Sequence, residues 1–216
     1  MGLKVVHIES GLRSFDFFEP FPEEICRVVV SRLADIHFCP NIWSLRNLRQ
    51  VRGVKINTFQ NTFSESFFLA LQQTPSLKAK KVASGKYFIL VLHRQEHIFF
   101  NRHESKNVVE FILKNKPVGL KCLIIKHATT EKFLQSIKGE YLALPRLPYI
   151  DFVYLLKKAE FIATDGGGNQ EEAYYLGKPC LILRNRTERI EGLGENAILA
   201  KGSTRIIKSF LKNYKI

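Results

Sequence analysis

The chain has 216 residues, 45% of them hydrophobic, which is enough to bury a substantial core as one large domain or two small ones. Its formal net charge is +13, but the basic residues are scattered over predicted helix faces and turns, which argues against a nucleic-acid-binding protein. The sequence has neither an apolar run long enough to cross a bilayer nor a signal-peptide pattern, so we expect a cytoplasmic protein without membrane contacts.

Strands and helices alternate from the first residues onward. Residues Lys4–Ile8 form a predicted buried strand that delivers Glu9 to its carboxyl end, where open α/β sheets bind their ligands. Pro22 followed by Glu23 and Glu24 predicts a helix start, because proline and acidic residues suit the first turn. That helix should run to about residue 34. After it we expect a strand at 36–39, a helix from about 41 to Gly53, a strand at 54–59 and a helix at 64–73.

A polar, lysine-rich connection at 74–86 is the predicted linker. The alternation then resumes, which predicts an α/β protein with parallel strands, right-handed crossovers and helices on both faces. An amphipathic helix at 204–214 is expected to end the chain. The expected divisions are therefore 1–73, 74–203 and a final helix, 204–216. Strands are expected near 87–92, 121–126, 141–144, 161–164 and 180–183.

Three glycines between Asp165 and Asn169 end an apolar run and open a helix. Backbone amides at such a turn can approach a phosphate closely. Carboxylates in the first helical turn would suit the positive end of the helix dipole, and one could accept a hydrogen bond from a ribose hydroxyl. Because tight strand-to-helix turns need glycine anyway, the turn by itself is a weak signal for a nucleotide site.

The stretch from Asp151-Phe152 to Arg189 resembles the UDP-N-acetylglucosamine 2-epimerase family in order and spacing. The resemblance continues in His7–Ser14, Pro22–Arg27 and Leu92–Glu96. It implies a type B glycosyltransferase-like fold, with two Rossmann-like domains facing each other across a cleft. The family's opening β-α units have no counterpart here, so we expect an N-terminally truncated chain whose first domain is incomplete and whose first sheet has an open edge.

The resemblance implies interconversion of UDP-N-acetylglucosamine and UDP-N-acetylmannosamine by elimination and re-addition of UDP, in surface polysaccharide biosynthesis. It assigns Glu9 and Glu23 to the acid-base pair and His93 to the leaving-group side. Glu23 is equally well explained as a first-turn acid, whereas the motif around Glu9 favours a functional role over a plain strand-end carboxylate. The resemblance further implies substrate or UDP contacts for Arg13, Arg27, Arg94, His127, Gly167, Gly168, Gln170, Glu171, Glu172, Arg184, Thr187, Glu188 and Arg189.

Three local departures from the family pattern stand out. The family commonly has serine where Gly166 stands. Its Gly-Asn-Thr motif is replaced by Gln60-Asn61-Thr62, and the proline often seen after the histidine at His127 is missing. The remaining histidines, His37, His97 and His103, are expected to be surface or packing residues.

Alternatives remain open on the sequence. One alternative is an inactive UDP-binding fragment, which the missing N-terminal half supports. A further alternative is a type B glycosyltransferase, which would leave Glu9, Glu23 and His93 unexplained. The ligand implied is a UDP-N-acetylhexosamine, and the resemblance allows a homodimer and a separately encoded N-terminal segment as partners. We expect no cofactor and no metal, because histidines and cysteines never occur at ligand spacing. The cysteines are expected to be reduced core thiols: Cys26, Cys39, Cys122 and Cys180.

Overall fold

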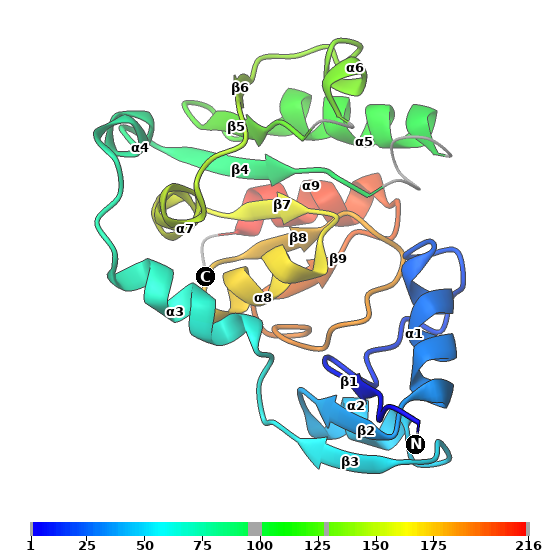
Figure 1. Cartoon of the computed structure of the whole chain (residues 1–216). Coiled ribbons are helices and arrows are strands. Elements are labelled where there is room, and N and C mark those ends of the chain that lie inside the picture. The colour runs from blue at the N-terminus through cyan, green and yellow to red at the C-terminus, as the bar shows by residue number, and fades with distance from the viewer. Residues whose placement is uncertain (1, 95–100, 128–129, 215–216) are drawn as a thin grey trace. The chain divides into compact units, whose positions relative to one another are not determined.

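The structure is a computed structural model that describes residues 2–94, 101–127 and 130–214. The chain divides into two compact units, each with its own sheet (Figure 1). Unit 1 comprises Met1–Leu69 together with the short segment Thr187–Arg189. Unit 2 comprises Ala70–Arg186 and Ile190–Ile216. Three residues from the last third of the sequence therefore belong to the N-terminal unit.

Unit 1 is built on a three-stranded parallel sheet in the order β1-β2-β3. The predicted helix start at Glu23 is confirmed, and both Glu23 and Glu24 lie in the first turn of α1. Helix α2 begins after Asn41, whose side chain accepts a hydrogen bond from the Ser44 N–H at 2.8 Å and so caps the helix. The elements are β1 (Val6–His7), α1 (Glu23–Leu33), β2 (Ile36–Cys39), α2 (Ile42–Asn47), β3 (Val54–Asn57) and α3 (Phe63–Gln72).

Two predictions for unit 1 need correction. The first strand covers only Val6–His7 rather than Lys4–Ile8, because the chain turns directly afterwards and Glu9 adopts a left-handed φ of 58°. Helix α2 ends at Asn47 instead of continuing to Gly53. Apolar side chains at positions 3, 6 and 8, and at 25, 29 and 33 of α1, are exposed in unit 1.

Unit 2 contains a six-stranded sheet in the order β6-β5-β4-β7-β8-β9, and every neighbouring pair is parallel (Figure 1). The predicted parallel α/β architecture is therefore confirmed. The elements are α4 (Leu77–Val82), β4 (Tyr87–Val91), α5 (Arg102–Asn115), β5 (Lys121–Ile125), α6 (Glu131–Leu134), β6 (Leu142–Leu144), α7 (Tyr149–Lys158), β7 (Ile162–Thr164), α8 (Gly167–Tyr175), β8 (Cys180–Ile182), β9 (Ala197–Leu199) and α9 (Thr204–Asn213).

Helices cover both faces of this sheet, because successive side chains of a strand point to opposite faces. In β4, Phe88 and Leu90 pack into a core that includes residues of α5 and α9. Tyr87 and Ile89 pack into a second core that includes residues of α7 and α8. Each large apolar side chain removed from water in this way contributes about 1.5–3 kcal/mol to stability. The two cores hold the carboxyl ends of the strands in fixed register.

The predicted linker at 74–86 is wrong in its centre, where α4 occupies Leu77–Val82. The Ser76 hydroxyl accepts from the Ala79 N–H at 3.1 Å and donates to Asp151 at 2.7 Å. A side-chain cap anchored on a buried carboxylate thus stabilises a lysine-rich helix whose composition suggests a loop. Strand β9, only three residues long, is an element that the sequence patterns do not predict.

All four cysteines are free thiols. Cys39, Cys122 and Cys180 are buried as predicted, whereas Cys26 is exposed on α1. Burial raises the pKa of Cys180 to about 12, so this thiol stays protonated and inert at neutral pH. Among the helices that the structure describes, none combines the length and the apolar character needed to cross a membrane.

Candidate nucleotide and acid-base sites

The glycine-rich turn of unit 2 joins β7 to α8, as predicted. The Thr164 hydroxyl accepts a hydrogen bond from the Gly166 N–H at 2.9 Å and donates to the Asn169 side-chain oxygen at 3.0 Å. Helix α8 begins at Gly167, and no side chain caps its first turn. The N–H groups and the positive dipole end of this helix therefore suit an anion.

The prediction that carboxylates lie in the first turn of α8 is wrong. Glu171 and Glu172 lie in the second turn, and both are buried, at 1% and 3% exposure. They cannot act through the helix dipole at the first turn. Gln170, also buried, donates through Nε2 to the Glu191 carbonyl at 2.8 Å and so ties α8 to the loop after β8.

Glu172 accepts hydrogen bonds from the Tyr149 hydroxyl at 2.9 Å and from the Asn169 amide at 2.6 Å. Burial nevertheless raises the pKa of Glu172 to about 7, since the two hydrogen bonds only partly offset the cost of desolvating its charge. Burial and the neighbouring Glu172 also raise the pKa of Tyr149. The two hydrogen bonds fix the orientation of the Glu172 carboxyl group.

His93 follows β4 and is held by Asp165 at the end of β7. The Asp165 carboxylate, which is fully buried, accepts from the backbone N–H groups of His93 and Arg94 at 3.0–3.2 Å. His93 Nδ1 lies 3.3 Å from Asp165 Oδ1, so the carboxylate also fixes the imidazole orientation. The His127 ring centroid is 6.5 Å from that of His93, which places both predicted histidines at one sheet edge.

A cavity of about 370 Å³ opens at this edge. Its apolar wall includes Ile125, Leu147 and Phe152, and its polar wall includes His93 and Tyr149. Such a mixture of an apolar wall and a few polar groups is typical of a small-molecule site.

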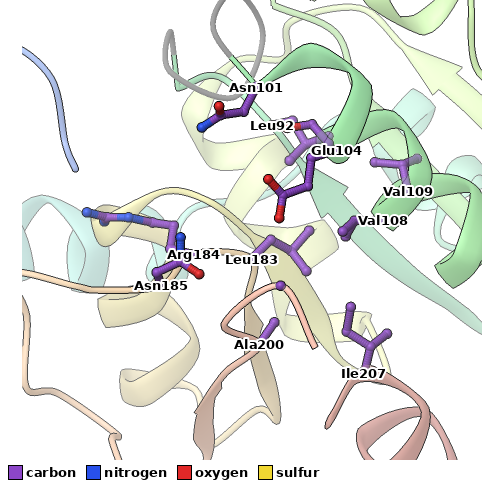
Figure 2. Close-up of a pocket in the computed structure, with 12 residues that line it drawn as sticks. Leu92, Asn101, Glu104, Val108, Val109, Leu183, Arg184, Asn185, Ala200 and Ile207 are labelled. Atoms are coloured by element: carbon purple, nitrogen blue, oxygen red, sulfur yellow. The ribbon is translucent and has the colours of Figure 1, made fainter. Parts of the chain in front are cut away.

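A smaller cavity of about 50 Å³ lies on the opposite face of the same sheet, between α5 and the start of α9 (Figure 2). Leu183 and Ile207 give it an apolar floor, with Glu104 of α5 above. The Arg184 guanidinium points away from Glu104 in this view, and Arg184 is only 2% exposed. The predicted phosphate ligand Arg184 therefore follows β8 and is among the residues that line this smaller cavity, with its guanidinium directed away from Glu104.

In unit 1, Glu9 sits at the sheet edge after β1. Its Oε1 lies 3.3 Å from Arg189 Nη2 and also accepts a hydrogen bond from the Asn61 amide. The left-handed backbone at Glu9 costs of order 1–3 kcal/mol for a residue with a side chain, and such conformations cluster at functional sites. Gly11, with φ of +85°, lies so close to α2 that a Cβ atom would stand 2.1 Å from the Ser44 carbonyl oxygen.

The other predicted unit 1 residues surround α1. Glu23 is partly exposed, while its neighbour Glu24 is buried and accepts from the Ser14 N–H at 3.1 Å. Arg27 Nη2 lies 3.4 Å from Glu188 Oε1. The next residue, Arg189, makes the ion pair with Glu9 described above. The Thr187 hydroxyl accepts from the Arg189 N–H at 3.3 Å.

Arg13 is buried, and its guanidinium is engaged within unit 1. It donates to the Leu12 carbonyl at 2.8 Å and to the Ser31 hydroxyl at 2.7 Å. Burial lowers the pKa of Arg13, although the group remains charged at neutral pH. The geometry thus gives Arg13 a bracing role between the loop before α1 and the helix itself.

Sequence reasoning gave no role to several residues that hold these sites together. Asp165 and Asn169 flank the three glycines. Asp165 directly follows a strand and Asn169 lies in the first turn of a helix, and these positions could have marked both as site residues. Asn61 lies in the stretch that stands where the family has Gly-Asn-Thr, which was a signal, whereas Tyr149 carries none because its contact depends on the fold. Residues 95–96 of the predicted motif, His97, and 128–129 after His127 lie outside the described residues.

Replacing Gly166 with Ser, the residue common in the resembled family, is expected to displace the His93 ring. A Cβ atom at position 166 would stand 2.4 Å from His93 Cε1, so the ring must move and its contact with Asp165 must weaken. Because the His93 side chain is 39% exposed and can move, we expect the main effect to be a shift of the imidazole resonances of His93 in NMR spectra.

Gly168→Ser is the matched control, because no atom lies within 4 Å of its added Cβ. Equal effects of the two serine substitutions would contradict this account of Gly166.

Known proteins resemble this chain over nearly its full length. The family model described as UDP-N-acetylglucosamine 2-epimerase matches residues 1–214. A protein named UDP-N-acetylglucosamine 2-epimerase from Campylobacter jejuni is 32% identical over 94% of this chain and 58% of its own length. The crystal structure of the Methanocaldococcus jannaschii UDP-GlcNAc 2-epimerase in complex with UDP-GlcNAc and UDP superposes with a TM-score of 0.86 at 29% identity, over 98% of this chain and 62% of that one.

The chain spans about three fifths of the length of these relatives. A spinosyn rhamnosyltransferase matches with a TM-score of 0.50 at 12% identity over 89% of this chain and 67% of that one, which extends the likeness in fold to a glycosyltransferase. The family model covers nearly all of the sequence, so this chain belongs to the UDP-N-acetylglucosamine 2-epimerase family.

Proposed function

We propose that the chain interconverts UDP-N-acetylglucosamine and UDP-N-acetylmannosamine in the cytoplasm, for surface polysaccharide biosynthesis. The observation that supports this most directly is the cavity of unit 2. Three features lie at the same sheet edge: the start of α8, His93 with its partner Asp165, and Glu172 with its partners Tyr149 and Asn169. The chain also belongs to this family. Unit 2 would bind UDP, and unit 1 would carry the acid-base residues.

Unit 2 offers groups that suit a nucleoside diphosphate part by part. Leu147 and Phe152 offer an apolar surface to the uracil ring. Glu172, directed by Tyr149 and Asn169, would accept a hydrogen bond from a ribose hydroxyl. The first turn of α8, with Gly167 and Gly168, and the guanidinium of Arg184 would take the diphosphate.

The proposed reaction has two balanced steps. A carboxylate removes the C2 proton of the sugar while the C1–O bond to UDP breaks, giving 2-acetamidoglucal and UDP. A carboxylic acid then returns a proton to the other face of C2 as the UDP oxygen re-forms the bond to C1. The Arg189 guanidinium beside Glu9 suits an ionised base, Glu23 would be the second acid-base group, and His93 would stabilise departing UDP.

Proton NMR of UDP-N-acetylglucosamine with the chain in deuterated water tests the proposal. We expect deuterium to enter at C2 and saturation to transfer to the uridine protons. Saturation transfer without exchange would identify a UDP-binding chain that does not catalyse, and the absence of both signals would contradict the proposed function. Transfer of the sugar to an acceptor without C2 exchange would instead indicate a glycosyltransferase.

Arg184→Ala is expected to weaken UDP affinity about 10- to 100-fold, because it removes charge-assisted hydrogen bonds to phosphate. Isothermal titration calorimetry with UDP measures the change. Arg186→Ala is the matched control, since Arg186 lies two residues away on the same loop but is exposed. UDP affinity that stays within threefold in Arg184→Ala would remove Arg184 from the phosphate site.

A further inference from the structure

Two histidines of unit 1 are joined through one serine hydroxyl. His7 and His37 are paired across the neighbouring strands β1 and β2, and their ring centroids lie 6.3 Å apart. Ser10 Oγ lies 3.0 Å from His7 Nδ1 and 2.9 Å from His37 Nδ1. Ser10 and His37 are fully buried, while His7 is partly exposed and comes two residues before Glu9.

The hydrogen-bond chemistry fixes where the protons lie. His37 Nε2 is 3.0 Å from the Arg52 carbonyl, which can only accept, so His37 carries its proton on Nε2. The Nδ1 of neutral His37 is then an acceptor, and Ser10 donates its single hydroxyl proton to it. Ser10 Oγ has only lone pairs left for His7, so His7 must donate from Nδ1. If His7 Nδ1 carried no proton, the Nδ1 lone pairs of His7 and His37 would both face the single hydroxyl proton of Ser10.

The second partner of His7 agrees with this direction. Ser31 Oγ, 3.5 Å from His7 Nδ1, already donates to the Arg27 carbonyl at 2.7 Å and accepts from Arg13 at 2.7 Å. It too can only accept from His7. Burial lowers the pKa of His7, the positive charges of Arg13 and Arg27 lower it further, and Glu9 opposes them. A neutral imidazole with one proton, on Nδ1, is the result.

We propose that His7 presents Nε2 as a neutral hydrogen-bond acceptor beside Glu9 for a hydroxyl group of the bound sugar, and that Ser10 and His37 are positioning residues that hold this tautomer. Within the described part of the chain, no hydrogen bond ends at His7 Nε2, and the ring is partly exposed. The identity of the ligand rests on the proposed function, whereas the tautomer does not.

NMR spectra of the chain labelled with ¹⁵N-histidine test the tautomer without any ligand. At pH 8 we expect a protonated Nδ1 and an unprotonated Nε2 for His7, identified by the signals lost in His7→Asn. Ser10→Ala is expected to release His7 to a mixture of tautomers, since the hydroxyl that orders the protons is gone. A proton on His7 Nε2 in the unaltered chain would overturn the inference.

Two isosteric variants test the acceptor. Gln places its amide oxygen near the position of Nε2, whereas Asn reaches only the position of Nδ1. We expect His7→Asn to lower kcat/KM for C2 exchange about 10-fold and His7→Gln to stay within about threefold, with UDP affinity unchanged in both. Equal losses in both variants would overturn the acceptor role.

The failure of this inference is distinguishable from failure of the proposed function. If the unaltered chain exchanges no deuterium at C2, the epimerase proposal fails, and the ¹⁵N spectrum then decides the inference. UDP-N-acetylglucosamine should move the His7 Nε2 resonance while UDP alone leaves it unchanged. Saturation transfer to uridine without any movement of that resonance would overturn the role of His7.

Discussion

Glu9→Gln is expected to slow deuterium exchange at C2 of UDP-N-acetylglucosamine by ~10² to 10⁴, the range for a lost acid-base group. Glutamine keeps the length of the side chain and an oxygen that can accept from Arg189 and Asn61. It cannot take up a proton, so the loss should fall on kcat rather than on binding. NMR exchange rates together with calorimetry of UDP binding measure the two quantities separately.

Glu23→Gln should produce a loss of the same order, because elimination and re-addition need proton transfer on both faces of C2. Glu65→Gln is the control in the same unit, since Glu65 is exposed in the first turn of α3. Exchange within about tenfold of the unaltered chain in either Glu9→Gln or Glu23→Gln would show that the acid-base assignment of that residue is wrong.

Glu172→Gln is expected to stabilise unit 2 in a pH-dependent way. The pKa of Glu172 is raised from 4.5 to about 7, so the folded chain binds a proton that the unfolded chain releases between these values. The free energy of unfolding therefore falls as pH rises through this window, by about 3 kcal/mol in full. Glutamine removes the titration and keeps an oxygen for Tyr149.

Urea unfolding at pH 5, 6, 7 and 8 checks this prediction. The advantage of Glu172→Gln should be small at pH 5 and grow up to pH 8. Glu140→Gln is the matched control, since the Glu140 side chain is 93% exposed and no such trend is expected there. A stability difference between Glu172→Gln and the unaltered chain that stays constant with pH would contradict a raised pKa at Glu172.

The elements that sequence patterns predict best are those with strong local signals. The helix that starts at Glu23 and the buried strands around Phe88 and Leu123 follow from first-turn acids and continuous apolar runs. Strand β9 is not predicted because three residues carry too little periodicity. Helix α4 is not predicted because its cap depends on Asp151, which is 75 positions from Ser76 in the sequence. Local composition cannot report a partner that only the fold provides.

The candidate sites divide in the same way. The glycine turn and the residues around Glu9 are visible in the sequence because their spacing is local. The depth of Glu172, which gives its unusual pKa, depends on how α8 packs against the sheet. The direction of the protons between His7 and His37 depends on a carbonyl of Arg52, a group that every residue has and no sequence pattern marks.

The segment Thr187–Arg189 makes unit 1 discontinuous along the gene. A recombinant piece ending at residue 69 would contain Glu9 but lack Arg189, and it would contain Arg27 but lack Glu188. Each of these two ion pairs would lose a member, so dissecting the protein at the obvious boundary would change the very carboxylate under study. A faithful minimal version of this unit requires a graft of the distant tripeptide, either as a fused loop or as a complementing peptide.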